Sequence, residues 1–481
     1  MSTQQPTLSE LIAALPAGSG EELEQDASAR EELGRMLAGM GSRPMPTGRL
    51  SRMWSVGSLQ AKLALAYTSW WLRSGFQDAE SKRRGLDETH LRAAVQVLER
   101  MTTLRGAVMK LGQVIAHWPH VAPNAFSNVL SRLFMEAPPM HFSLLREHLR
   151  RELGADPSEL FDEFEETAFA SASLGQVHRA RLKGSGQRVA VKIQYPDIDR
   201  TIKSDVKNLK AAGFGMRFSG DWENLLAQYE GIERMLEMEV NYEAEARHLE
   251  HAREVLKDLD DVVIPVLHPE FCSKRVLTMD YIEGQHLEAF MAQHPTQELR
   301  DAHGTQIERA LFRLWYSGRV IYADPHPGNF IFMPDGRLGL VDFGCCHDFS
   351  DKEFEYILDV ERSSKGSEAE WRRAIAHGCD LEPEAMSEER FALMREYCDW
   401  LWQPLQCSGP FDFGKPGQFE EGVRLYGTFI KRRWTRSQPV NVWLTKHFFG
   451  ARAMLTHLKA RVDYCRLMSE ESPLGAPRTD A

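Results

Sequence analysis

The chain has 481 residues, 43% of them hydrophobic and 26% charged, so apolar material for a folded core is ample and global disorder is excluded. The formal net charge is −11, from 58 Lys and Arg against 69 Asp and Glu. This argues against a nucleic-acid partner, because phosphate contacts need a basic surface. The seven cysteines form no CxxC pair, which indicates reduced thiols rather than a zinc site or a disulfide framework.

The first part of the chain is predicted to be helical after a loose start. Residues 1–48 are rich in Ala, Gly, Ser, Pro and Glu and predict a poorly ordered tail. Residues 58–73 have helical periodicity, with Tyr67, Trp70 and Trp71 toward one end. This helix has two possible roles. It packs on the rest of the protein, which is slightly favoured, or it contacts lipid headgroups. Further helices are expected over 86–120 and 143–153.

The middle of the chain changes to strand patterns and then returns to helices. Residues 169–194 predict two strands around a Gly-Ser-Gly turn, and VVIPVL and KRVLTMDYI also favour strands. Helices are expected over 202–255 and 287–318, and from 351 to the end. Between them, NFIFM-PDG-RLGLVDFG predicts a hairpin with a Pro-Asp-Gly turn. Helices, then a small sheet, then helices indicate an α+β fold.

A strong chemical signal lies in ADPHPGNF at 323–330 and VDFG at 341–344. Asp324 and Asn329 are five residues apart, and Asp342 follows after the predicted hairpin. Protein kinases use this order of a catalytic Asp, an Asn five residues later and a DFG Asp. Mg²⁺ prefers hard oxygen ligands, which Asn329 and Asp342 provide, and Asp324 can orient or deprotonate an attacking hydroxyl or water.

Two further features belong to the same chemistry. VAVK ends at Lys192, which is the pattern of a strand lysine that holds the α- and β-phosphates. A buried ammonium needs a carboxylate partner, and the segment LEMEVNYEAEA offers Glu237 and Glu243, between which the sequence does not decide. Before Lys192, where a kinase has GxGxxG, this chain has an alanine-rich loop that restricts the backbone near the phosphates. The candidate nucleotide-binding residues are Ala170, Ser171, Ala172, Ser173, Gly175, Gln176, Lys192, Asp280 and Ile282.

At these motifs the sequence resembles the UbiB/AarF group of atypical kinase-like proteins. The resemblance rests on KLGQ, ASASLGQVH, VAVKIQYP, EMEVNYEA, ADPHPGNF and VDFG, in this order over about 235 residues. The segments PTGRLSRMWSVGSL and LKARVDYC resemble the flanks of the eukaryotic coenzyme Q branch. The resemblance implies a bilobal kinase-like fold, ATP or ADP with Mg²⁺, and a role in ubiquinone biosynthesis.

The resemblance also implies four regions. They are a tail over 1–48, an N-terminal helical extension over 49–160, a kinase-like N-lobe over 161–285 and a helical C-lobe over 286–481. In the family, the Lys and Gln of KxGQ fold over the active site and obstruct a peptide site, and by motif match these roles fall on Lys110 and Gln113. The family's E-x-D motif reads Glu237-Met238-Glu239 here, which puts a direct metal role of Glu239 in doubt.

Three functions follow as alternatives. The first is an ATPase coupled to an isoprenoid quinone precursor or another lipid at a membrane. The second is a small-molecule or lipid kinase, and the third a nucleotide-binding pseudokinase scaffold for biosynthetic protein partners. No run of about 18 apolar residues occurs, and the acidic start lacks the order of a signal peptide. We expect a cytoplasmic chain without a transmembrane helix, with peripheral contact at the inner face of a membrane left open.

Overall fold

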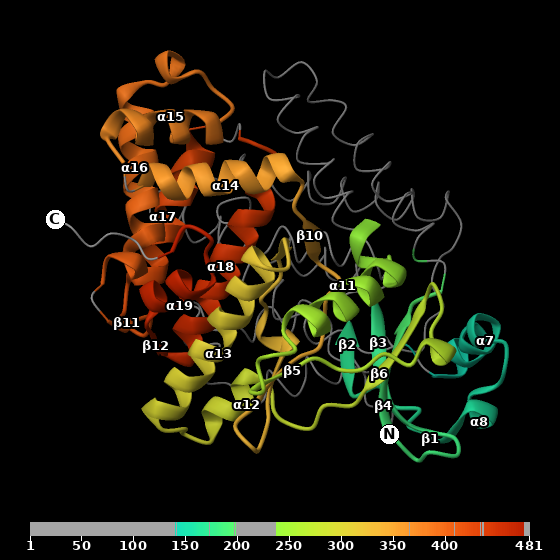
Figure 1. Cartoon of the computed structure of the whole chain (residues 1–481). Coiled ribbons are helices and arrows are strands. Elements are labelled where there is room, and N and C mark those ends of the chain that lie inside the picture. The colour runs from blue at the N-terminus through green and yellow to red at the C-terminus, as the bar shows by residue number, and fades with distance from the viewer. Residues whose placement is uncertain are drawn as a thin grey trace, which may run out of the picture. The chain divides into compact units, whose positions relative to one another are not determined.

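The computed structural model describes residues 140, 142–172, 174–196, 198, 237–364, 366–407, 409–432, 434 and 437–475 (Figure 1). Two compact units are distinguished. One contains Met1–Pro157, Phe164–His178 and Lys192–Val240, and the other Ser158–Glu163, Arg179–Val191 and Asn241–Ala481. The four regions expected from the sequence stay a prediction. The mixture of helices with small sheets confirms the α+β class.

In the first unit, helix α7 (Phe142–Leu153) confirms the helix expected over 143–153. Strand β2 (Ala170–Ala172) pairs antiparallel with the start of β3 (Gly175–Leu182), with Ala170 opposite Val177 and Ala172 opposite Gly175. The alanine-rich loop is therefore a tight β-hairpin. The unit also holds the last residues of β4 (Arg188–Gln194), in which four consecutive side chains ending at Gln194 are buried.

The strands β1 (Phe161–Phe164), β3, β4 and β6 (Val276–Asp280) are neighbours in this order, and the second unit holds β6 and part of each of the other three. The Gly-Ser-Gly turn between β3 and β4 closes through the amide of Gly186, which donates to Leu182 O at 2.9 Å. A second sheet has the order β5 (Val262–Val263), β9 (Leu338–Leu340) and β8 (Phe330–Phe332). The β8–β9 pair confirms the predicted hairpin, and Gly336 takes the left-handed conformation of its turn with φ of 84°.

Helices make up most of the second unit. Asn241 caps the N-terminus of α11 by accepting a hydrogen bond from Ala244 N, and Thr296 caps α13 in the same way through Leu299 N. The remaining elements are α8 (Pro157–Leu160), α11 (Tyr242–Val255), η3 (Pro269–Phe271), α12 (Leu287–Ala292), α13 (Gln297–Tyr316), β7 (Val320–Tyr322), η4 (Pro327–Asn329), β10 (Cys346–Asp348), α14 (Asp351–Ser364), α15 (Glu368–Gly378), η5 (Pro383–Ala385), α16 (Glu388–Trp402), η6 (Gln403–Gln406), β11 (Phe411–Asp412), α17 (Gln418–Lys431), α18 (Asn441–Leu458), β12 (Arg461–Val462) and α19 (Tyr464–Glu471).

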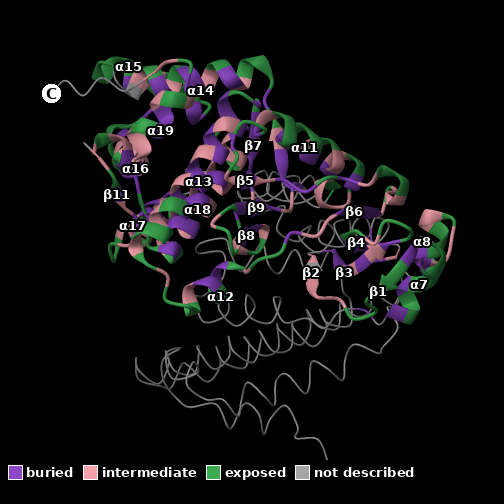
Figure 2. Ribbon diagram, turned by 60° about the horizontal axis from the view of Figure 1, so that its bottom comes forward, coloured by how far each residue is buried: buried purple, intermediate pink, exposed green. Residues whose placement is uncertain are grey.

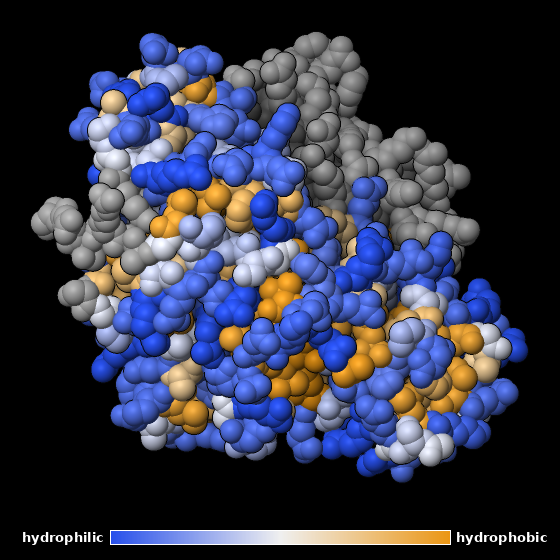
Figure 3. Space-filling model, viewed as in Figure 1, coloured by the Kyte–Doolittle hydropathy of each residue, from blue (hydrophilic) through white to orange (hydrophobic). Residues whose placement is uncertain are grey.

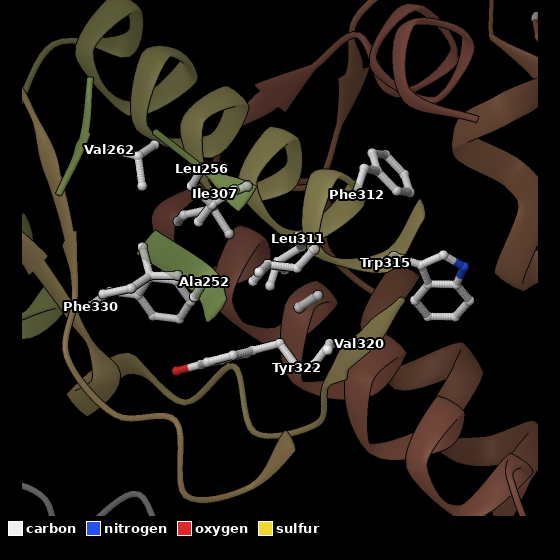
Figure 4. Packing of buried hydrophobic residues seen from close by; sticks show 14 of the residues in the cluster. Ala252, Leu256, Val262, Ile307, Leu311, Phe312, Trp315, Val320, Tyr322 and Phe330 are labelled. Atoms are coloured by element: carbon white, nitrogen blue, oxygen red, sulfur yellow. The ribbon is translucent and has the colours of Figure 1, made fainter. Parts of the chain in front are cut away.

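The main core of the second unit is built around α13. Its buried residues recur from His303 to Tyr316 (Figure 2), and Ile307, Leu311 and Trp315 pack with apolar side chains of α11, β7 and β8 (Figure 4). Hydrophilic side chains cover most of the face in Figure 3. Among the described residues, the large hydrophobic side chains that remain exposed are Leu144, Val266, Leu299 and Val442. The buried core thus supports β7 and β8, the strands that flank the loop at 323–329.

Candidate active site

The loop that carries Asp324 begins at the end of β7. Strand β7 pairs antiparallel with β10, with Tyr322 opposite Cys346. One residue further on, Ala323 N donates to Cys345 O at 2.9 Å. This pairing places the residue before Asp324 beside the residue that follows the DFG triplet.

The loop closes on itself through Asp324. The backbone carbonyl of Asp324 accepts from His326 N at 2.7 Å and from Asn329 Nδ2 at 2.8 Å. The ring Nδ1 of His326 accepts from Gly328 N at 3.1 Å, so this side chain has a structural role in the loop. Because the amide nitrogen of Asn329 is bound within the loop, its carbonyl oxygen is the atom suited to a metal.

The DFG triplet lies beside this loop. Val341 N donates to Asn329 O at 3.1 Å, which brings the residue before Asp342 next to Asn329. Within the triplet, Gly344 N donates to Asp342 Oδ1 at 2.9 Å, and Phe343 is buried. The structure therefore brings Asp324, Asn329 and Asp342 together, as their spacing predicts.

A second carboxylate lies beside the triplet and was missed by the sequence analysis. A Cβ placed on Gly344 would lie 3.3 Å from Glu245 Oε2 and 3.2 Å from Asp342 Oδ1. Glu245 is buried, whereas Glu237 and Glu243 are exposed. Tyr242, Glu245, Leu249 and Ala252 are the buried residues of α11. Their helical spacing was the signal that could have identified Glu245.

Burial keeps the polar groups behind the loop in their neutral forms. Burial, and next to it the charge of Asp342, raises the pKa of the Tyr322 phenol well above its ordinary value. Burial likewise raises the pKa of the Cys346 thiol. Cys345 and Cys346 are both buried thiols, which agrees with a packing role.

The alanine-rich hairpin of the first unit is supported by Gln176. This fully buried side chain accepts from Met140 N at 2.7 Å through Oε1, and its Nε2 donates to Met140 O at 3.1 Å. The same Nε2 lies 2.9 Å from His178 Nε2, and His178 Nδ1 lies 2.7 Å from Glu165 O. The polar atoms of Gln176 are thus bound within the protein, so only its backbone is left for the nucleotide contact predicted for it.

The other predicted nucleotide residues lie in both units. Lys192 is buried in β4 of the first unit. In the second unit, the carboxylate of Asp280 accepts from Gln187 Nε2 at 2.6 Å and bonds His268 Nε2 at 2.8 Å. Ile282 is buried against Gly339, where an added Cβ would lie 3.0 Å from Ile282 Cγ2. The segment after β6 is thereby fixed over β9.

Several predicted features lie outside the described residues. They are the tail over 1–48, the helices over 58–73 and 86–120, the part 202–236 of the segment expected to be helical over 202–255, and Lys110, Gln113 and Ser173.

The described residues contain no group of three or more His, Cys, Asp or Glu side chains arranged around a metal position. This donor set still fits Mg²⁺, which usually takes one or two protein carboxylates and completes its shell with phosphates and water. Asp342 and Asn329 would hold it. Among the described helices, none has the length and hydropathy needed to cross a bilayer.

A closed Asp-to-Asn loop followed by a hairpin and DFG is the arrangement of a kinase-like domain. Residues 132–364 match the ABC1 atypical kinase-like domain. The chain is 30% identical over 447 residues to the mitochondrial atypical kinase COQ8B of Rattus norvegicus, covering 89% of this chain and 81% of that protein. It therefore belongs to the ABC1 atypical kinase-like family, the UbiB/AarF group that the motifs indicated.

Two further comparisons extend this result. An uncharacterized protein of Synechocystis is 33% identical over 268 residues, which cover 55% of this chain and 39% of that protein. The chain thus spans well under half the length of this relative. The structure of Rv3197 from Mycobacterium tuberculosis, in complex with erythromycin, aligns with a TM-score of 0.54 at 24% identity, over 83% of this chain and all of that one. It shows the likeness of the fold.

Proposed function

We propose that this chain is an atypical kinase-like ATPase that binds ATP or ADP with Mg²⁺ and supports ubiquinone or other isoprenoid lipid biosynthesis at a membrane surface. The observation that supports the proposal is the closed loop in which Asn329 Nδ2 donates to Asp324 O, together with the bond from Val341 N to Asn329 O that brings the residue before Asp342 next to Asn329. Family membership supports it. A bilobal arrangement, the obstructing roles of Lys110 and Gln113, and the pairing of Lys192 with a glutamate belong to the same proposal.

The roles of the side chains follow from their chemistry. Bound Mg²⁺ would neutralise charge on the β- and γ-phosphates. The half-buried Asp324 orients the attacking water or hydroxyl and accepts its proton. Lys192 contributes a buried positive charge for the α- and β-phosphates, and Glu237 and Glu243 remain the two carboxylate partners proposed for it from the sequence. The alanines of the hairpin limit backbone approach to the phosphates, which favours slow transfer.

The test is phosphate release from ATP with Mg²⁺, with and without anionic liposomes and a phenolic mimic of a quinone precursor. We expect release that rises with lipid or phenol and falls at least about a hundredfold in Asp342→Asn, since the metal carboxylate is lost. Release that is unaffected by Asp342→Asn would contradict the proposal. A phosphorylated phenol or lipid would favour the kinase alternative, and nucleotide binding without any turnover would favour the scaffold.

A further inference from the structure

Helix α18 lies about a hundred residues beyond the catalytic motifs and outside the match to the ABC1 domain, which ends at residue 364. It nevertheless packs directly against the loop. A Cβ on Gly450 would lie 2.7 Å from Pro325 Cγ, so only glycine allows this approach. One turn earlier, Lys446 Nζ lies 3.5 Å from Cys345 Sγ. The same helix face therefore contacts the start of the loop and the residue after DFG.

Between these two contacts along α18, His447 forms a hydrogen bond with β7, the strand that precedes the loop. Its Nδ1 lies 2.9 Å from Tyr322 O. A carbonyl oxygen only accepts, so Nδ1 carries the proton and donates. Burial lowers the pKa of His447 to about 4, and the ring is neutral at pH 7. A neutral, buried imidazole in one tautomer is a rigid donor.

Tyr322 in turn contacts the DFG triplet. Its hydroxyl donates to Asp342 O at 2.7 Å, and the side chain is buried. The ring makes an edge contact with Phe343, with centroids 5.5 Å apart and an interplanar angle of 79°. Figure 4 shows Tyr322 within the core, close to Phe330 and Val320. The two hydrogen bonds thus form a continuous path from α18 to the backbone of Asp342.

We infer that His447 and Tyr322 are positioning residues that fix Asp342 from α18, through the bonds from His447 to Tyr322 O and from the Tyr322 hydroxyl to Asp342 O. Neither side chain is required to touch the nucleotide. The inference rests on the proposed function, because it concerns the carboxylate assigned to Mg²⁺. According to this inference, α18 (residues 441–458) helps to position the site.

Tyr322→Phe removes one hydroxyl and keeps the ring, so it isolates the bond to Asp342. Tyr316→Phe is the matched control, because this buried tyrosine of α13 donates to Glu361 Oε2 at 3.0 Å. ATP binding is titrated with Mg²⁺ by calorimetry. We expect Tyr322→Phe to raise the Mg²⁺ concentration for half-maximal ATP binding roughly three- to tenfold, as loss of one neutral hydrogen bond implies. Tyr316→Phe should leave it unchanged.

The histidine is tested with a rescue pair. His447→Leu removes the donor and should give a similar rise, whereas Asn carries a donor near the position of Nδ1, so His447→Asn should restore most of the wild-type Mg²⁺ requirement. His303→Leu is the control, since this buried histidine bonds Gln306 Oε1 at 2.7 Å instead. Thermal unfolding without nucleotide measures any general loss of stability in all the variants.

A second measurement does not depend on nucleotide binding. Gly344 N donates to Asp342 Oδ1, so its amide exchange reports how firmly the carboxylate is held. Exchange of the peptide over 341–345 should be several-fold faster in Tyr322→Phe and His447→Leu than in their controls. Wild-type exchange and Mg²⁺ requirement in both variants would overturn the inference. If the wild type shows no Mg²⁺-dependent ATP binding, the proposed function fails, and the exchange data alone decide on the positioning.

Discussion

The loop at 323–329 and the alanine-rich hairpin at 170–177 are held by different kinds of contact. The loop is held by side chains that bond backbone carbonyls. Asn329 bonds Asp324 O within the loop, and His447, 125 residues further along the chain, bonds Tyr322 O in the strand before it. The hairpin is fixed by strand pairing and by Gln176, whose side chain bonds the backbone N–H and C=O of Met140, 36 residues earlier in the chain. A lost contact in the loop should shift a ligand, whereas a lost contact behind the hairpin should weaken the first unit itself.

The largest effect is expected behind the hairpin. Gln176→Leu leaves the buried N–H and C=O of Met140 without their partners, which costs about 2–5 kcal/mol of unfolding free energy for two unsatisfied groups. Chemical denaturation of the full chain measures it. Gln293→Leu, at an exposed position, is the control and should change stability by less than about 0.5 kcal/mol. Equal stability of the two variants would show that the hairpin is held by strand pairing alone.

The next effect compares the two buried histidines across pH. Burial lowers the pKa of His178 in the first unit and lowers that of His447 to about 4 in the second. Both pKa values lie below the value of 6.5 in the unfolded chain. At a pH just below 6.5, each histidine is therefore protonated in the unfolded chain but remains neutral in the folded one. The stability that both groups contribute is therefore fully present above pH 6.5 and is lost as the pH falls below 6.5, down to about pH 4 for His447.

For His447 this loss reaches about 3.5 kcal/mol, because its pKa is lowered from 6.5 to about 4 and each pKa unit corresponds to about 1.4 kcal/mol. Unfolding free energies of the wild type and His447→Asn, measured from pH 7.5 to 4.5, give the contribution by difference. The variant should lose less stability on acidification. If both proteins show the same slope, His447 is charged in the folded protein, and its role as a one-tautomer donor is wrong.

The same contrast explains what could be predicted from the sequence. The β8–β9 hairpin was predictable because Pro-Asp-Gly sets its turn locally, and Asp324, Asn329 and Asp342 because their spacing is set by that hairpin. The parallel pairing of β5 with β9 was not predicted, since Val262 and Leu338 meet only through tertiary packing. The contacts of α18 with the loop carry no local signal for the same reason.

The sequence did not predict the role of a side chain where one motif allows two interpretations. Glu243 and Glu245 both belong to the segment EAEA. Glu243 is exposed, whereas Glu245 lies on the buried face of α11 beside Gly344, and this difference is visible only in the structure. Gln176 lies within the motif expected to bind nucleotide, yet its side chain faces the other way and bonds Met140. A motif match identifies a position, and the burial pattern decides which partner the side chain has.

The smallest effect concerns the hairpin's approach to phosphate. Ala170 is paired with Val177 in the β2–β3 ladder, so Ala170→Gly widens the range of backbone conformations there and costs about 0.5–1 kcal/mol of stability. A freer backbone next to the phosphates should change ATP and ADP affinity by up to about fivefold. Calorimetric titration with each nucleotide measures the change in affinity.

Ala180→Gly is the control, because Ala180 lies in β3 on the face of His178 and not in the hairpin turn. It should lower stability without changing affinity. Unaltered binding of both nucleotides in Ala170→Gly would mean that backbone stiffness in this hairpin does not limit the approach to phosphate.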